Sequence, residues 1–318
     1  MQKTYQAADP RFASVECVFF VIGAQKAGTT WLSHYFRGHP NVSVPLWKEH
    51  NYWNMVEGRP TSGRMLGAQS DRRKRDGVLR KIGRSLEFTN YGRRQKAITL
   101  ALKASEAAHA PHSAYADVLL QNAGNATGAM GELCPQYALL KSQTFAEMNG
   151  LMDNVRFVYI LRDPLSRFLS GVQHNMRKSS GSTEVTIEKL SEQVNNSAKN
   201  PESGPIRRSR YDQTIAQLEE HVPQEQIMYV FFENLFEQTQ VQKICDFLNV
   251  PFVPAAVSRK RNVAGKSAVA VSDLDRSVAA RPLKPVYEFA LERFGTDLPK
   301  KWMTNAALSG AIVEEMVG

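Results

Sequence analysis

Three short runs of β-branched and aromatic residues constrain the fold of this chain most strongly: CVFFVI at 17–22, VRFVYIL at 155–161 and IMYVFF at 227–232. None of them alternates between apolar and polar residues, which is typical of strands that are buried on both faces. A helical pattern follows each run. Strands that alternate with helices predict a parallel sheet covered on both sides, so we expect a three-layer α/β/α fold. Sheets of this kind bind ligands at the carboxyl ends of their strands.

Helices are expected over 29–37, 164–177 and about 237–248. Asp163 stands where an N-cap is expected, and Pro164 suits the first position of the second helix. Within that helix, apolar residues recur with the spacing of a single helix face. They are Leu165, Phe168, Leu169, Val172 and Met176.

The 318 residues show no repeats and no low-complexity linker, and we interpret 1–318 as one domain. Between 57 and 128 the sequence becomes charged and alanine-rich, which predicts a helical insertion that shapes a second substrate's site. Residues 179–209 are polar and loop-like, and we expect a flap there.

The net charge of +9 indicates anionic partners. Its densest cluster, at 72–84, could bind a polyanion or make a peripheral contact with acidic lipid. A solvated basic surface is an equally good interpretation. No aromatic residue is interleaved with this charge, so we expect no nucleic-acid partner.

The three cysteines, Cys17, Cys134 and Cys245, are far apart and form no CxxC pair. This pattern predicts reduced thiols and neither a metal site nor a disulfide framework. No apolar run is long enough for a membrane span, and residues 1–12 lack the apolar core of a signal peptide. We therefore expect a cytoplasmic protein.

The stretch VFFVIGAQKAGTTWLS at 18–33 has the layout of a phosphate-binding loop, G-x-x-x-x-G-K-[ST]. An apolar run ends at Gly23, and Gly28 precedes a helix. One feature departs from the motif: Thr29 occupies the lysine position, and the lysine stands upstream, at Lys26. A tight strand-to-helix turn without a ligand is the alternative interpretation.

The loop still has the groups that bind an anion. Its glycines let backbone amides face a ligand, and the helix N-terminus contributes its dipole. Thr29 and Thr30 add hydroxyl donors, and Lys26 can reach an oxygen of the transferred or leaving group. What is lost is the adjacent lysine–hydroxyl pair that holds a β/γ-phosphate and magnesium.

A second element lies at 159–175, YILRDPLSRFLSGVQHN. Arg162 ends a buried strand, and Ser170 lies about 9 Å along the following helix from Pro164. A guanidinium and a hydroxyl so placed could hold one phosphate from two sides. A magnesium site at this strand end is the competing interpretation, which the capping role of Asp163 disfavours.

These residues carry a family resemblance. QKAGTTWL and LRDPLSRFLS resemble the sulfotransferases that use 3′-phosphoadenosine-5′-phosphosulfate (PAPS), a family with a fold similar to the P-loop NTPases. In motif order the chain is most similar to heparan-sulfate-type and bacterial members, and the resemblance covers roughly 17–262. The matching segments are 25–32, 48–53 (KEHNYW), 131–137 (GELCPQY), 161–170, 209–235 and 247–251 (FLNVP).

The resemblance implies PAPS as sulfuryl donor, its desulfated product 3′-phosphoadenosine-5′-phosphate (PAP), and no required metal. In that family the first loop binds the 5′-phosphosulfate, which here implies Gln25, Lys26, Ala27, Gly28, Thr29 and Thr30. An Arg…Ser pair binds the 3′-phosphate, which implies Arg162 and Ser170. Weaker candidates for nucleotide contacts are Arg210, Tyr211, Arg259, Lys260 and Asn262.

For the chemistry, the resemblance implies that Lys26 stabilises the leaving phosphate and that Glu49 is the base for the acceptor proton. Lys48 contacts the sulfate or tunes Glu49, unless the two form only a surface ion pair. His50 is a rival base, because the family's His-Phe-Phe is here Asn-Tyr-Trp. His174 is a further candidate.

Glu132 and Tyr137 are expected to line the acceptor side, with packing as an equal alternative. Cys134 replaces a common threonine of the family. The acceptor would offer a hydroxyl or an amine on a carbohydrate, a lipid-linked molecule or a small metabolite. A P-loop nucleotide kinase and a non-catalytic protein that binds anionic glycan or lipid are the alternative functions. The sequence does not indicate an oligomeric state.

Overall fold

The structure is a computed structural model, which describes eight ranges of the chain. These are 8–46, 48–59, 99–100, 103–104, 106–120, 128–179, 186–256 and 270–312.

A five-stranded parallel sheet forms the centre of the molecule, in the strand order β2-β3-β1-β4-β5. Its strands are β1 (Cys17–Gly23), β2 (Val42–Ser43), β3 (Ala129–Leu133), β4 (Val155–Leu161) and β5 (Ile227–Phe231). The three strands expected from the apolar runs are thus confirmed. Strands β2 and β3 were not expected, because β2 has two residues and β3 (AMGEL) contains a glycine and a glutamate, which are rare in strands.

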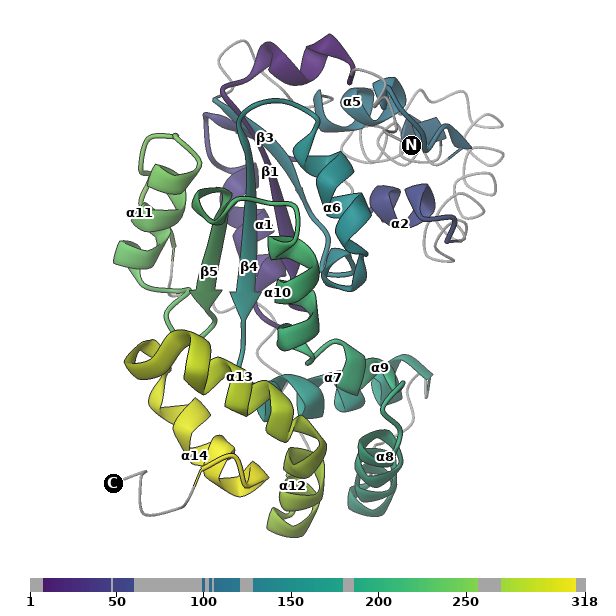
Figure 1. Cartoon of the computed structure of the whole chain (residues 1–318), viewed down its shortest axis with the longest axis vertical. Helices are drawn as coiled ribbons and strands as arrows, with labels where there is room; N and C mark the ends of the chain where they lie inside the picture. The colour runs from purple at the N-terminus through teal and green to yellow at the C-terminus, as the bar shows by residue number, and fades with distance from the viewer. Residues whose placement is uncertain are drawn as a thin grey trace, which may run out of the picture.

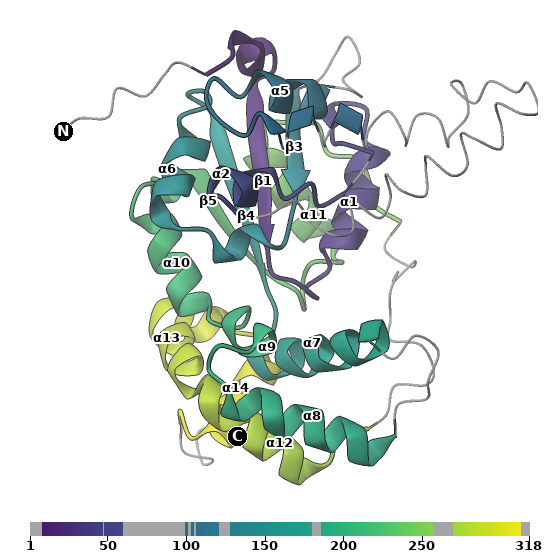
Figure 2. The same cartoon turned by 90° about the vertical axis from the view of Figure 1, so that its right-hand side faces the viewer.

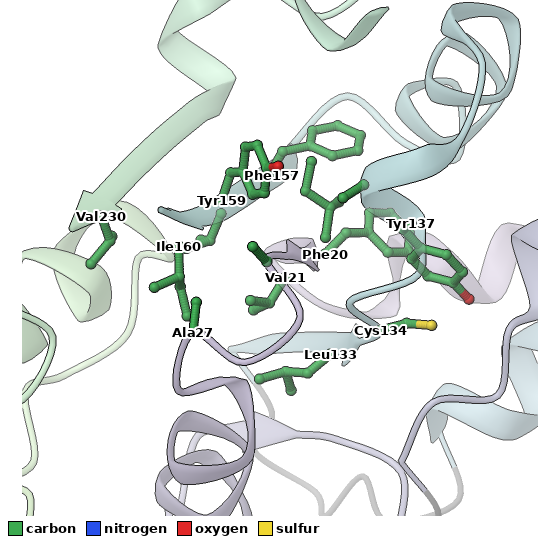
Figure 3. Close-up of a cluster of buried hydrophobic side chains, with 14 of the residues drawn as sticks. Phe20, Val21, Ala27, Leu133, Cys134, Tyr137, Phe157, Tyr159, Ile160 and Val230 are labelled. Atoms are coloured by element: carbon green, nitrogen blue, oxygen red, sulfur yellow. The ribbon is translucent and has the colours of Figure 1, made fainter. Parts of the chain in front are cut away.

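Helices cover both faces of the sheet. Figure 2 shows α1 and α11 on one side of it and α6 and α10 on the other, which confirms the three-layer α/β/α fold. These helices are α1 (Thr29–Arg37), α6 (Ser142–Asn149), α10 (Tyr211–Glu219) and α11 (Gln238–Phe247). The apolar side chains between the layers, shown in part in Figure 3, form one continuous core.

The remaining helices lie around this centre. Figure 1 shows α7, α8, α9, α12, α13 and α14 gathered beyond the carboxyl ends of β4 and β5, whereas α5 lies near the upper part of the sheet and α2 at about its mid-height. They are α2 (Tyr52–Val56), α5 (Ser113–Leu120), α7 (Pro164–Ser179), α8 (Ile187–Lys199), α9 (Gly204–Arg207), α12 (Asp273–Ala280), α13 (Lys284–Phe294) and α14 (Lys300–Ser309). The short 3₁₀ helices are η1 (Pro10–Ser14), η2 (Tyr137–Leu139), η3 (Gln224–Gln226), η4 (Arg281–Leu283) and η5 (Gly295–Asp297).

One local expectation was wrong. Much of the polar stretch 179–209 is helical rather than loop-like, because it contains α8 and α9. Three residues of α8 at four-residue spacing, Leu190, Val194 and Ala198, are buried and give it an apolar stripe. Its remaining surface is so polar that the stripe is inconspicuous in the sequence. Most of the insertion at 57–128, including the basic cluster at 72–84, lies outside the described residues.

In the part of the chain that the structure describes, no helix combines the length and the apolar character that a membrane span needs.

Candidate active site

The turn Ala24–Gly28, which we call the glycine loop, joins β1 to α1. Gly28 has φ +87° and precedes α1 as its N-cap, and Lys26 has φ +74°. Because the N-cap of α1 is a glycine, it has no side chain that could cap the helix. A loop of this shape turns its amides and the helix dipole toward an anion.

Lys48 lies in the segment between β2 and α2, and its side chain contacts the first turn of α1, next to the glycine loop. Its Nζ donates to Thr29 Oγ1 at 3.0 Å and to Thr30 Oγ1 at 3.1 Å. An ammonium can only donate, so both hydroxyls act as acceptors toward Lys48 and keep their own hydrogens for another acceptor. The lysine–hydroxyl pairing that the shifted motif lacks is therefore restored by a lysine nineteen positions along the chain. No local spacing in the sequence indicates this pairing.

Positive charge is concentrated around the loop. Burial lowers the pKa of the Lys26 ammonium, and it is the largest cause. The charges of Arg177, Arg162 and Lys48 lower that pKa further. Among the described residues, no carboxylate forms an ion pair with Lys26 or with Arg162. Clustered cations, two of which have no carboxylate in an ion pair within the described residues, favour a bound anion.

Arg162 lies directly against the glycine loop. Its Nη1 donates to the carbonyl oxygen of Lys26 at 2.8 Å, and its guanidinium lies 4.8 Å from the ring centre of Phe232. The hydroxyl of buried Tyr211 donates to the carbonyl oxygen of Arg162 at 2.7 Å. Tyr211 therefore holds the backbone of Arg162 and is itself almost inaccessible to a nucleotide. Ser170 lies on α7, half-buried.

Asp163 caps α7 as expected, since its Oδ1 accepts from the backbone N of Ser166 at 2.7 Å. Among the described residues, no group of three or more histidine, cysteine, aspartate or glutamate side chains is arranged to hold a metal ion.

The segment Glu49–Asn51 has a constrained backbone. Glu49 has φ +63° and Asn51 has φ +59°, values that non-glycine residues rarely adopt. The side chain of Glu49 is 30% exposed and its Oε1 lies 3.4 Å from Lys48 Nζ. Backbone strain of this kind persists where surrounding contacts enforce it, often at functional sites. Glu49 is thus accessible and adjacent to the lysine that contacts the loop.

Glu132 supplies those enforcing contacts. One of its oxygens accepts from the backbone N of His50 at 2.9 Å and lies 3.1 Å from His50 Nδ1. The other accepts from the hydroxyls of Tyr115 and Tyr137, each at 2.7 Å. All four residues are buried. Cys134 Sγ adds a hydrogen bond to Asn51 Oδ1 at 3.2 Å, so the end of β3 holds both residues that follow Glu49.

Burial in this cluster separates from solvent the two residues expected on the acceptor side, Glu132 and Tyr137, and the rival base His50. Glu132 and His50 are each 1% exposed, and Tyr137 is fully buried. They hold the segment that carries Glu49 and have almost no surface for an acceptor. Sequence reasoning placed them near the site but did not identify the hydrogen-bonded cluster that they form.

Two residues of α7 extend the site. His174 is half-buried, and burial lowers the pKa of its imidazole. The charges of Lys26 and Arg177 lower this pKa further, whereas Glu49 raises it. Ser170, His174 and Arg177 follow at four- and three-residue spacing, which places them on one helix face. Arg177 was not a candidate from the sequence, although this spacing could have indicated it.

The remaining nucleotide candidates are Arg210, Gln25 and Ala27 among the described residues and three others outside them. Arg210 forms an ion pair with Asp212 at 2.6 Å and remains partly exposed. Gln25 is half-buried in the glycine loop, whereas Ala27 is buried there. Outside the described residues are Arg259, Lys260 and Asn262.

Several solved structures are similar to this chain. A sulfotransferase from Alicyclobacillus acidocaldarius is 17% identical with a TM-score of 0.48, over 92% of this chain and 94% of that chain. The sulfotransferase domain of the Synechococcus PCC 7002 olefin synthase is 17% identical with a TM-score of 0.46, over 94% and 99%. The sulfotransferase domain from the curacin biosynthetic pathway is 19% identical with a TM-score of 0.44, over 76% of each chain.

No protein among those with curated descriptions matches the chain in sequence. The sequence model of the sulfotransferase family matches residues 19–254, about three-quarters of the chain, and this range contains the glycine loop, Glu49 and α7. The chain therefore belongs to the sulfotransferase family.

Proposed function

We propose that this sulfotransferase moves a sulfuryl group from PAPS to a hydroxyl or amine of a carbohydrate or lipid-linked acceptor. The observation that carries the proposal is the hydrogen bond from Arg162 Nη1 to the carbonyl oxygen of Lys26. It joins the two elements that the family uses for the two phosphate-bearing ends of PAPS. The arginine for the 3′-phosphate and the loop for the 5′-phosphosulfate thus belong to one site.

The residues present suit such a donor. The cations Lys26, Lys48 and Arg162 lie around the loop, and the N-cap of α1 is a glycine, which has no side chain. Two phosphates and a sulfate would compensate this charge. Gly28 has φ +87° and a β-carbon there would lie 2.5 Å from Leu235 Cδ2, so any other residue would strain the loop.

PAPS, when bound, supplies the sulfuryl group and a phosphate leaving group. Lys26 and Lys48 provide positive charge where negative charge develops, the contribution that dominates transfer reactions of this class. Lys48 also fixes the oxygens of the Thr29 and Thr30 hydroxyls, so that their hydrogens are available to the donor. Arg162 and Ser170 hold the 3′-phosphate.

Glu49 accepts the acceptor's proton in this proposal. It is the accessible carboxylate next to Lys48, and its backbone is fixed by the bonds of Glu132 and Cys134 to the two residues that follow. His50 is unsuited to this role because its side chain is 1% exposed and its Nδ1 is occupied by Glu132. His174 is the second candidate base, since it is half-buried and lies within the electrostatic range of Lys26 and Glu49.

The acceptor class rests on the similarity of the Lys48-Glu49 segment to heparan-sulfate-type enzymes. A cytoplasmic setting is supported by the three cysteines, which are buried and form no disulfide.

Titration calorimetry tests the donor. We expect PAP to bind tightly in buffer containing a chelator, and ATP with magnesium to bind more weakly. A preference for ATP with magnesium would support a nucleotide kinase instead. Incubation of a cell extract with radiolabelled PAPS and the enzyme, followed by identification of the labelled product, identifies the acceptor. Label confined to small metabolites would contradict the carbohydrate or lipid-linked class.

A further inference from the structure

Asp163 follows Arg162 directly and is fully buried. Besides the capping bond from Ser166, its carboxylate accepts two side-chain hydrogen bonds. Asn305 Nδ2 donates to Oδ1 at 2.8 Å, and the hydroxyl of Tyr287 donates to Oδ2 at 2.8 Å. Tyr287 belongs to α13 and Asn305 to α14, so two of the three bonds to this carboxylate come from the C-terminal helices.

Tyr287 also contacts the first turn of α7 directly. Its hydroxyl oxygen accepts from the backbone N of Leu165 at 3.1 Å. The first amides of a helix have no partner within the helix, so this bond satisfies one of them. A single phenol thus joins the residue next to Arg162 to the helix that carries Ser170, and it does so in a buried environment.

A second connection runs from α14 to Arg162. Trp302 packs against the ring of Tyr211, with ring centres 6.1 Å apart. Tyr211 in turn donates to the carbonyl oxygen of Arg162. Trp302 Nε1 also donates to Oε2 of Glu233, just after the end of β5, at 3.4 Å. Figure 1 shows α13 and α14 directly beyond the ends of β4 and β5.

The C-terminal helices span 273–309, beyond the residues 19–254 that match the family model. Their contacts with Asp163 and α7 are therefore not part of what the family match describes. The backbone of Arg162 is held on one side by Tyr211, on which Trp302 packs, and on the other by Asp163, whose carboxylate accepts from Tyr287 and Asn305.

We infer that Tyr287 and Asn305 are positioning residues for Arg162 and α7, and that the C-terminal helices thereby determine recognition of the nucleotide's 3′-phosphate. The inference rests on the proposed function, because it assumes that Arg162 and Ser170 hold that phosphate. Neither residue contacts the nucleotide in this arrangement. They fix the position and orientation of Arg162 and Ser170, the residues that hold the 3′-phosphate in the proposed function.

Calorimetric titration of Tyr287→Phe with PAP and with AMP tests the inference, since the two nucleotides differ only in the 3′-phosphate. The substitution keeps the ring and removes one donor and one acceptor. We expect the affinity for PAP to fall about tenfold or more, and the affinity for AMP to change less than about twofold. Asn305→Ala should act in the same direction.

Tyr229→Phe is the matched control. The Tyr229 hydroxyl also donates to a carboxylate, Glu219, at 2.9 Å, and its ring packs on Phe294 of α13. This substitution should leave both affinities unchanged. Melting temperatures of all variants show whether each one is folded at the temperature of the titration.

Unchanged PAP affinity in Tyr287→Phe, or equal losses for PAP and AMP, would overturn the inference while leaving PAP binding by the original chain intact. Failure of the original chain to bind PAP would instead overturn the proposed function, and the inference with it. Hydrogen exchange provides a test without substitution. PAP should slow amide exchange in α13 and α14 more than AMP does, and equal protection by both would count against the inference.

Discussion

Glu132 holds His50 at two points, accepting from its backbone N at 2.9 Å and lying 3.1 Å from its Nδ1. The same carboxylate accepts from two buried tyrosines. A buried carboxylate with this many donors is stable as a charged group, and it keeps the segment beginning at Glu49 in its strained conformation. The cluster links the core of the fold to the catalytic candidate.

Replacing Glu132 with glutamine should destabilise the protein by about 2–4 kcal/mol, because the amide reproduces only part of the accepting capacity of a buried carboxylate. Urea unfolding measures the loss. Glu219→Gln is the control, since Glu219 also accepts from a tyrosine but is 31% exposed, and it should cost less than about 1 kcal/mol. Equal losses in the free energy of unfolding for the two substitutions would mean that burial of the cluster does not add to its contribution to stability.

The cluster should also give a pH dependence of stability. Burial raises the pKa of Glu132, but the charge of His50 and hydrogen bonds from His50 and two tyrosines outweigh it, so the net pKa lies below the ordinary 4.5. A lowered carboxyl pKa stabilises the fold above the unfolded value, and this contribution is lost as the pH falls through the folded value. Acid unfolding below pH 4.5 should therefore be less steep in Glu132→Gln than in the original chain.

Replacing Glu49 with glutamine should lower turnover at least about a hundredfold, as expected for loss of a general base, with PAP affinity changed less than about twofold. Single-turnover transfer of radiolabelled sulfate measures the rate, and calorimetry measures PAP binding. Glu57→Gln, at the C-cap of α2, is a control at another carboxylate. If Glu49→Gln retains its rate, the base role passes to His174, and His174→Ala should then show the loss.

Lys48→Met should weaken PAP binding by about tenfold. The substitution removes one cation and leaves the hydroxyls of Thr29 and Thr30 without the donor that orients them. Lys141→Met is the control, since this lysine is exposed at the N-cap of α6. A titration series at increasing salt should give a shallower salt dependence for Lys48→Met than for the control. Identical slopes would show that Lys48 does not contact the donor's charge.

Gly28→Ala and Gly58→Ala form a matched pair of substitutions at positive φ, +87° and +78°. A β-carbon at 28 would lie 2.5 Å from Leu235 Cδ2, whereas one at 58 would meet nothing within 4 Å. Gly58→Ala should cost only the backbone strain, about 1 kcal/mol. Gly28→Ala should cost about 1–3 kcal/mol more and should abolish PAP binding. Denaturant unfolding and calorimetry measure the two effects, and equal costs would contradict the tight contact with Leu235.

PAP binding should be coupled to proton uptake at alkaline pH. Burial and neighbouring cations lower the pKa of Lys26 below the ordinary 10.5. An anion on the loop favours the charged ammonium and raises its pKa, so protons bind together with PAP and affinity falls as the pH rises. Calorimetry in buffers of different ionisation enthalpy measures the uptake, which should be smaller in Lys26→Met. Proton release on binding would contradict this assignment.

The sequence determined those parts of the protein whose signals are local. Strands β1, β4 and β5 are continuous apolar runs, and α7 has both its cap and its apolar face within a few residues. The glycine loop, Arg162 and Glu49 were located for the same reason, because each belongs to a short motif. Strand β3 was not expected, because its five buried residues include a glycine and a glutamate, and helix α8 was not expected, because its few buried residues lie among polar ones.

Tertiary structure alone decided how the motifs are joined. Lys48 meets Thr29 and Thr30, Glu132 accepts from His50 82 residues away, and Tyr287 donates to Asp163 across 124 residues. Such bonds form where packing of the sheet and helices brings the groups together and excludes water, and residue spacing along the chain carries no record of that packing. The family could therefore be anticipated from short motifs, whereas the contacts that hold the groups of the candidate site in place required the fold.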